Sequence, residues 1–426
     1  ADVAKDSDTD KSYAASLGLE SVDRTIRRAQ QRFIDWSKKP ADKRHKADLI
    51  STLGGDFSKL LDSLTIARSR EHIGRFFDHE MVRLGGFPTR APVHSEFIAH
   101  IDSHRLFPDF EKVAMQLASL KLPMFTPSTF LRDDLSEDIK THYAALRNKH
   151  LTQETREKTL VAIMKVLFLK RLESSVYSFT ATLARTIANI DDLLLRINRH
   201  AKLAADEPDL DLSGYELSEE DAEELGEILE VGKKLKYKLV HLDLAKWQAA
   251  LLADKSALMQ LYESAKPVEA ARDLKLIKLK ELIAQKLQTP HTDKHGKPNR
   301  KVIVFTAFAD TAQYLYDSLQ ADLLKVHQTH SGLVMGSVAK QNANPTRAKF
   351  NDVLTDFSPI SKRRNAKLSG EIDILFATDC ISEGQNLQDC DTVINYDIHW
   401  NPVRIIQRFG RVDRIGSSAV QVHMVN

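Results

Sequence analysis

The feature that most constrains the fold is a short apolar run near the end of the chain, residues 372–377, which is followed by a polar Thr-Asp pair. An almost unbroken apolar run of this length is typical of a strand that is buried on both faces of a parallel sheet. A similar run at 301–305 is followed by Thr306, and such runs alternate with stretches of helical character. The alternation predicts an α/β domain over 301–426, with a parallel sheet, right-handed crossovers and helices on both faces.

The segments before this domain differ from it in composition. Residues 137–288 carry apolar side chains at helical spacing, so we expect an almost wholly helical region there. Turn-forming prolines and glycines interrupt the chain before and after that region. The expected domain plan is a connecting segment over 1–90, an irregular connecting segment over 91–136, the helical region over 137–288, a linker over 289–300 and the α/β domain over 301–426.

Composition limits the classes of partner and of site. Lysine and arginine number 61 against 59 acids, so any nucleic-acid contact must be a local groove rather than a general basic field. Cys380 and Cys390 are the only cysteines, and they predict neither a disulfide framework nor a metal site. No apolar stretch is long enough to cross a bilayer, and the first residues are charged. These features predict a soluble cytoplasmic protein with no membrane partner.

A second feature is a pair of arginines close to the end of the chain. Arg411 and Arg414 are three residues apart beside Gly410, so on a helical turn both guanidinium groups project from one face. Arginine suits phosphate because it is always charged and offers forked donors. Such a pair by itself is more often a solvated basic face. Its occurrence together with the buried strand and its Thr-Asp tip favours a site for a phosphate-bearing ligand.

The combined pattern resembles a known family. Thr378 and Asp379, together with residues 382–384, resemble motif five of the superfamily-two helicases, and residues 407–414 resemble their motif six. The sequences at 400–402 and 413–416 are more similar to the Swi/Snf-type translocases and to RapA-like bacterial ATPases. Residues 170–175 also resemble a segment of bacterial Swi/Snf-like helicases. The fold implied for 301–426 is the second RecA-like motor domain, with the end of the first motor domain in 1–90 and a helical insertion domain over 137–288.

The resemblance implies that ATP lies between two RecA-like domains and that Arg411 and Arg414 act as catalytic residues at its γ-phosphate. The residues implied to line the nucleotide are Gln407, Asp379, Gly384 and Gly410. Nothing in the chain matches the phosphate-binding loop Gly-x-x-x-x-Gly-Lys-Ser/Thr. We therefore expect the loop and the ligands of Mg²⁺ to belong to a first motor domain outside this chain, without which the chain alone does not hydrolyse ATP.

The resemblance also suggests contacts with nucleic acid. Thr306 and Thr378 occupy motif positions whose hydroxyl or amide groups hold strand phosphates, although a threonine that ends a strand is as often structural. A dense group of cations, which we call the basic run, is either a solvated loop or a contact with the nucleic-acid backbone. The basic run consists of Lys362, Arg363, Arg364 and Lys367.

Three functions remain open at this stage. The first is the C-terminal part of an ATP-dependent helicase or double-stranded-DNA translocase, and Asp379, where Swi/Snf remodellers have arginine, favours a bacterial relative. The second is an RNA helicase, which differs only in substrate. The third is a non-catalytic module in which the helical region binds a partner protein and the motor domain serves as a scaffold.

Overall fold

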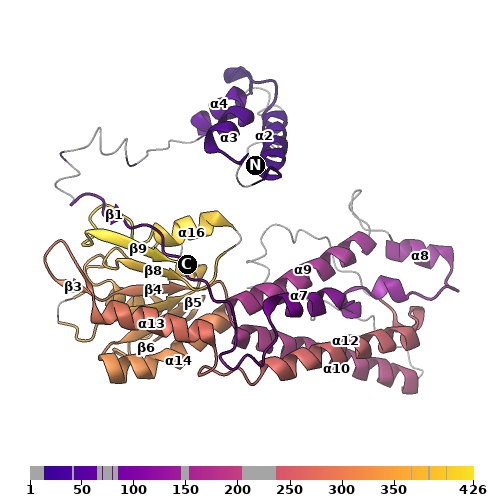
Figure 1. Cartoon of the computed structure of the whole chain (residues 1–426). Coiled ribbons are helices and arrows are strands. Elements are labelled where there is room, and N and C mark those ends of the chain that lie inside the picture. Colours follow the sequence, from indigo (N-terminus) through magenta and orange to yellow (C-terminus); the bar gives the residue numbers. More distant parts are fainter. Residues whose placement is uncertain are drawn as a thin grey trace. The chain divides into compact units, whose positions relative to one another are not determined.

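The computed structural model describes residues 14–40, 43–64, 70, 79, 85–144, 153–203, 237–365, 367–381, 384–399 and 401–426. The chain divides into two compact units, Ala1–Arg83 and Leu84–Asn426. The first contains helices α2 (Val22–Ser37), α3 (Lys46–Leu53) and α4 (Gly55–Leu64) around a small apolar core. The second contains a sheet domain and a bundle of helices (Figure 1).

The sheet is seven-stranded with the order β1-β9-β8-β4-β7-β5-β6. All its neighbouring pairs are parallel except β5–β6. This mostly parallel sheet confirms the predicted fold class. The strands are β1 (Thr89–Arg90), β4 (Val302–Phe305), β5 (Ser331–Met335), β6 (Val338–Gln341), β7 (Ile374–Ala377), β8 (Thr392–Asn395) and β9 (Gln421–Val425).

Helices cover both faces of the sheet. The central strands β4, β7 and β8 are therefore buried along their whole length. Helices α13 (Leu274–Gln288) and α14 (Ala309–His327) pack on one face, against alternate residues of the strands. Helix α15 (Phe350–Phe357) packs on the other face. The segment that follows β7 and the segment that follows α16 (Pro402–Phe409) pack on this face as well. Although α13 lies within the region 137–288, its leucines belong to the core of the sheet domain.

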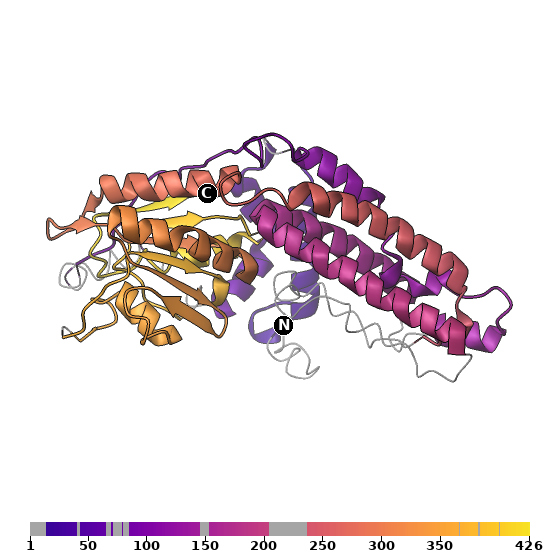
Figure 2. The ribbon, with the colours of Figure 1, turned by 90° about the horizontal axis from the view of Figure 1, so that it is seen from below.

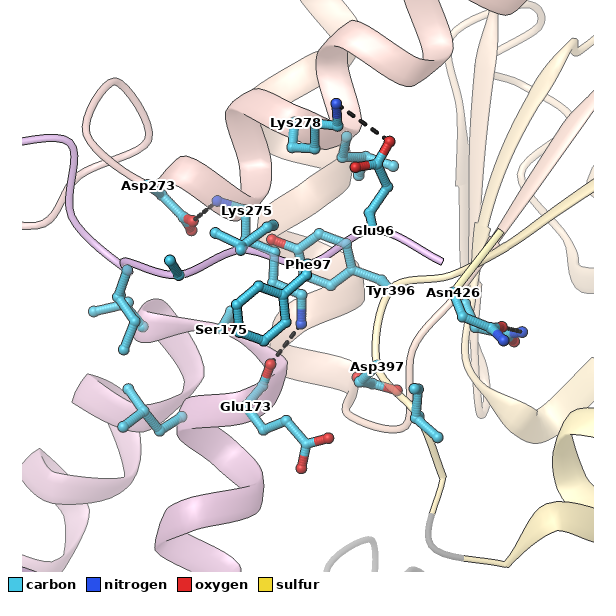
Figure 3. A pocket seen from close by; sticks show the side chains of 18 of the residues that line it. Glu96, Phe97, Glu173, Ser175, Asp273, Lys275, Lys278, Tyr396, Asp397 and Asn426 are labelled. Atoms are coloured by element: carbon cyan, nitrogen blue, oxygen red, sulfur yellow. Dashed lines mark hydrogen bonds and ion pairs between the residues drawn. The ribbon is translucent and has the colours of Figure 1, made fainter. Parts of the chain in front are cut away.

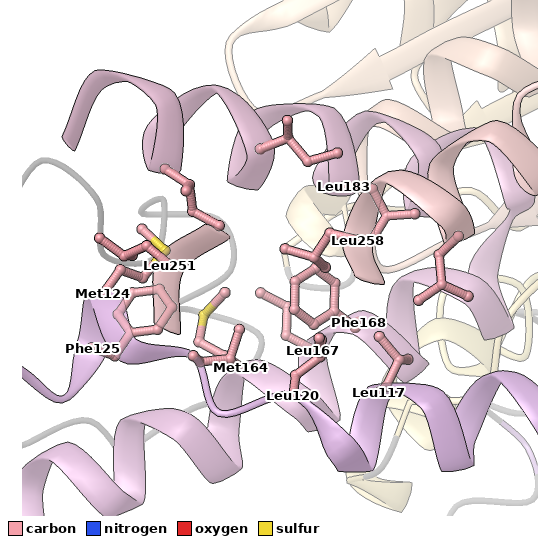
Figure 4. Close-up of a cluster of buried hydrophobic side chains, with 14 of the residues drawn as sticks. Leu117, Leu120, Met124, Phe125, Met164, Leu167, Phe168, Leu183, Leu251 and Leu258 are labelled. Atoms are coloured by element: carbon pink, nitrogen blue, oxygen red, sulfur yellow. The ribbon is translucent and has the colours of Figure 1, made fainter. Parts of the chain in front are cut away.

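The bundle, which we call the helical module, is an elongated group of helices beside the sheet (Figure 2). Its core is continuous and apolar, with Phe168, Leu183, Leu251 and Leu258 fully buried (Figure 4). The buried Trp247 donates its indole N–H to the carbonyl of Pro123 at 2.9 Å, which fixes a 3-10 turn against α12 (Leu244–Ala265). The helices are α7 (Phe110–Ser119), α8 (Glu137–Ala144), α9 (Gln153–Ser174), α10 (Val176–Leu203) and α12 (Leu244–Ala265).

The segment before α7 follows the edge of the sheet. Strand β1 pairs with β9, and His94 forms a further bridge with Val425. The short strands β2 (His291–Thr292) and β3 (Pro298–Asn299) form a hairpin between α13 and β4. No helix among the described residues is both long and apolar enough to cross a membrane.

Candidate functional site

The polar ends of the central strands meet at one edge of the sheet. Phe305 of β4 is in register with Ala377 of β7 on one side and with Asn395 of β8 on the other. The residues that follow these strands are therefore neighbours, and the amide of Thr306 donates to the carbonyl of Ala377 at 3.0 Å. Ligands of open parallel sheets bind at this carboxyl edge, as expected for the motif residues.

Helix α16 and the turn after it carry the motif that contains the arginines. The helix begins where the Asn401 side chain accepts a hydrogen bond from the amide of Val403, with Pro402 in the first turn, where its missing N–H is not needed. The last turn leads through Gly410 into a tight turn, in which the amide of Arg411 donates to the carbonyl of Arg408. Arg408 therefore lies in the last turn of a short, capped helix, and Arg411 and Arg414 lie in the turn that follows it.

Arg408 is fully buried and binds Asp379 through two parallel hydrogen bonds of 2.7 Å. The same guanidinium donates to the side chain of Asn395 at 3.2 Å and to the carbonyl of Asp397 at 3.1 Å. It also lies over the ring of Phe305. Asp379, which the sequence analysis assigned to the nucleotide, thus joins the segment after β7 to α16 through a bidentate ion pair of the strong type.

Arg411 and Arg414 are half-buried and reach the same short loop. Arg411 donates to the carbonyl of Gln385 at 3.2 Å, and Arg414 donates to the side chain of Asn386. A main-chain hydrogen bond also fixes the loop, since the amide of Leu387 donates to the carbonyl of Arg411 at 3.2 Å. The two guanidinium groups are therefore gathered around one loop at the carboxyl edge of the sheet.

The remaining residues predicted at the nucleotide lie in the same region. Gly384, at the start of the loop, has φ +71°, a left-handed conformation that favours glycine. Gly410 ends α16, and its carbonyl accepts from Arg414 at 3.1 Å, while the carbonyl of Gln407 accepts from Arg411 at 3.2 Å. The residues at 382, 383 and 400 lie outside the described part of the chain.

The basic run is divided between two environments. Lys362 donates to the side chain of Gln385 at 2.5 Å, and burial lowers the pKa of its ammonium group. Arg364 is buried and donates to Asp356 at 2.7 Å and to the carbonyl of Gly370 at 2.5 Å. Arg363 and Lys367 are exposed. A phosphate contact by Arg364 would require its bonds within the chain to open, whereas the two exposed side chains are accessible as they stand.

Both threonines predicted to hold strand phosphates are buried. The hydroxyl of Thr306 donates to Asp397 at 2.5 Å and lies 3.2 Å from the hydroxyl of Ser174. The amide of Thr378 donates to the carbonyl of Val334 at 3.1 Å. Contact of these groups with nucleic acid stays a prediction, and it requires the edge of the sheet to rearrange.

Sequence reasoning missed Arg408 and Asp397 as members of this site. One signal was available for Arg408, because a carboxylate directly after a buried strand, such as Asp379, needs a partner. Among the described residues, no group of three histidine, cysteine or carboxylate side chains could hold a metal ion. The half-buried Arg411 and Arg414 suit a polyphosphate chemically, and we assign Mg²⁺ to no residue of this chain.

Comparisons with known proteins find similarity to helicases. Residues 275–416 match the family described as the helicase conserved C-terminal domain. The chain is similar to "Uncharacterized ATP-dependent helicase YqhH" of Bacillus subtilis (strain 168), with 33% identity over 130 residues, 30% of this chain and 19% of that protein. It is also similar to ATP-dependent DNA helicase MPH1 of Coccidioides immitis (strain RS), with 28% identity over 116 residues, 27% of this chain and 9% of that protein.

Among solved structures, the chain is similar to the Pyrococcus furiosus Hef helicase domain, with 15% sequence identity and a TM-score of 0.40. That similarity covers 88% of this chain and 62% of the other. The chain spans 19% or less of the length of the two curated relatives named above. The match over residues 275–416 therefore makes this part of the chain similar to the conserved C-terminal domain of helicases.

Proposed function

We propose that this chain is the C-terminal motor part of a bacterial, cytoplasmic ATP-dependent helicase or double-stranded-DNA translocase. Residues 301–426 would be the second RecA-like domain, and the helical module an insertion between the motor domains. The convergence of Arg411 and Arg414 on the loop that follows β7 is the observation that carries the proposal. These two arginines are the proposed trigger, which stabilises the charge that develops on the γ-phosphate.

The nucleotide itself would be held mainly by a first motor domain outside this chain. Exposed charge contacts contribute only about 0–1 kcal/mol each, so two half-exposed arginines do not bind ATP strongly on their own. Asp379, through its ion pair with Arg408, would support the trigger rather than touch the nucleotide. Gln407, Gly384 and Gly410 are proposed to line the nucleotide.

The proposal predicts a division of activity between the chain and the longer protein. The 426 residues alone should show no ATPase activity, with or without DNA, because no segment of their sequence matches the phosphate-binding loop Gly-x-x-x-x-Gly-Lys-Ser/Thr. The full-length protein should hydrolyse ATP faster when double-stranded DNA is added. Arg411→Ala or Arg414→Ala should lower that rate by about 10³–10⁵, as removal of a trigger arginine does. Arg196→Ala is the matched control, since Arg196 lies on the exposed surface of α10.

The outcomes separate the three functions considered above. Stimulation by RNA and not by DNA would assign the protein to the RNA helicases. Wild-type rates in the double variant that lacks both trigger arginines would eliminate the proposed trigger. A full-length protein with no ATPase activity on any nucleic acid would leave the interaction module as the explanation.

A further inference from the structure

The helical module is joined to the sheet domain by a buried polar cluster at the end of α9. The hydroxyl of Ser174 lies 2.7 Å from the carboxylate of Asp397, 2.8 Å from the hydroxyl of Thr311 and 3.2 Å from the hydroxyl of Thr306. Ser174, Thr306 and Thr311 are fully buried. The last residue of α9 therefore enters the carboxyl edge of the sheet through hydrogen bonds that water does not replace.

Asp397 connects this cluster to the helix that bears the trigger. Its carboxylate accepts from the hydroxyls of Ser174 and Thr306 and from the amide of Ala307 at 2.9 Å. Its carbonyl accepts from Arg408 at 3.1 Å. Asp397 thus contacts the helical module through its side chain, and it contacts α16 through its carbonyl and through an ion pair of its carboxylate with Arg408 at 3.8 Å.

Neighbouring contacts fix the position of α9. Lys275 of α13 donates to the carbonyl of Glu173 at 2.5 Å and to that of Ser174 at 3.0 Å, so a cation covers the carbonyl end of α9 (Figure 3). Arg171 is buried and donates to Asp310 of α14 at 2.8 Å. A cavity of about 560 Å³ adjoins the junction, and Phe308 of the sheet domain packs into the apolar core of the helical module beside these polar contacts.

We infer that Ser174 is a positioning residue for the trigger, acting through Asp397 and Arg408. This inference rests on the proposed function. A buried polar cluster that is fully satisfied holds its members in one arrangement, whereas a member that loses its partner shifts. Without the hydroxyl of Ser174, the carboxylate of Asp397 loses a hydrogen-bond donor, and Asp397 shifts together with its carbonyl. Because Arg408 of α16 donates to that carbonyl, α16 shifts as well. The orientation of the helical module and the geometry of Arg411 and Arg414 are thereby coupled.

The test compares two adjacent serines in the full-length protein. Ser174→Ala removes the contact with Asp397. Ser175→Ala removes a hydroxyl that is also buried, lies 2.8 Å from that of Thr311 and accepts the amide of Ser178 at 3.0 Å, but that is not hydrogen-bonded to Asp397. Misplacement of a catalytic group by about 1 Å costs up to about 100-fold in rate. Ser174→Ala should lower kcat about tenfold or more without changing the KM for ATP, and Ser175→Ala should keep kcat within about twofold of the wild type.

A second measurement on the 426-residue chain does not depend on activity. In Ser174→Ala, hydrogen exchange at the amide of Ala307 and along α16 should become at least about tenfold faster, and in Ser175→Ala it should not. An unchanged kcat in Ser174→Ala, an equal loss in both variants, or unchanged exchange in α16 would each overturn the inference. If the wild-type protein hydrolyses no ATP, the proposed function fails, and the exchange result alone then decides whether Ser174 positions α16.

Discussion

Arg408 should be a structural arginine, although it lies three residues before the trigger. Replacing it with methionine removes two charge-assisted bonds to Asp379 and single bonds to Asn395 and to the carbonyl of Asp397. Removing one partner of a buried ion pair costs about 3–5 kcal/mol, because the remaining charge keeps its desolvation penalty. With an m-value of about 3 kcal/mol/M, the midpoint of urea unfolding of the sheet domain should fall by about 1–1.7 M.

The matched control is Arg411→Met, which removes a half-buried guanidinium that donates to the carbonyls of Gln407 and Gln385. Its cost should be below about 1 kcal/mol, as for exposed contacts that water can replace. Circular dichroism of the 426-residue chain in urea measures both variants without any activity assay. Equal midpoints for the two variants would refute the assignment of Arg408 to the fold and of Arg411 to the ligand.

Two further predictions concern charge. Arg363→Ala and Lys367→Ala in the full-length protein should each weaken DNA binding and reduce the log–log salt slope by about one unit, measured by anisotropy at several salt concentrations. Arg364→Ala should instead destabilise the sheet domain. If the log–log salt slope of DNA binding is unchanged in the Arg363 and Lys367 variants, the basic run is a solvated loop. His399 should make stability depend on pH, because burial lowers the pKa of its imidazole and its Nδ1 accepts the amide of Asn401 at 3.0 Å. Since the unfolded state then binds more protons, stability should fall as the pH drops below about 6.5, and His399→Gln should reduce that fall in urea titrations at pH 5 to 8.

The sequence predicted the centre of the sheet and missed its edges. Strands β4 and β7 are buried on both faces and are unbroken apolar runs, which the pattern identifies directly. Strand β5 contains Gly332, where a Cβ would lie 2.9 Å from Val353 and 3.0 Å from Ile372. The glycine is there because α15 packs closely on it, and sequence alone cannot reveal such packing. Strand β9 contains a glutamine and a histidine, and its partner β1 has only two residues.

The site was predictable by region and not by individual contacts. The motifs predicted that Arg411, Arg414 and the loop after β7 belong together, and the structure brings them into contact. The sequence does not show that Arg408 has a different role from Arg411 and Arg414. The three arginines lie within seven residues, and what distinguishes them is their partners, which are distant in the chain. Likewise, the resemblance at residues 170–175 gave Ser174 no role, because its partner Asp397 lies 223 positions away.

The role of Asp379 provides a decisive comparison between the sequence-based assignment and the structure. If it acts on the nucleotide, Asp379→Asn should raise the KM for ATP of the full-length protein and leave the fold unchanged. If it acts through Arg408, the same change removes the negative charge of the bidentate ion pair. It also places the N–H₂ group of the asparagine against an N–H group of Arg408, so that two donors face each other. The second case predicts a loss of about 3–5 kcal/mol in the unfolding free energy of the 426-residue chain, similar to that of Arg408→Met. The double variant Asp379→Asn/Arg408→Met should then cost much less than the sum of the two single changes, because both remove the same interaction. We expect this second result; additive costs, or a stable Asp379→Asn variant with a raised KM, would instead assign Asp379 to the nucleotide.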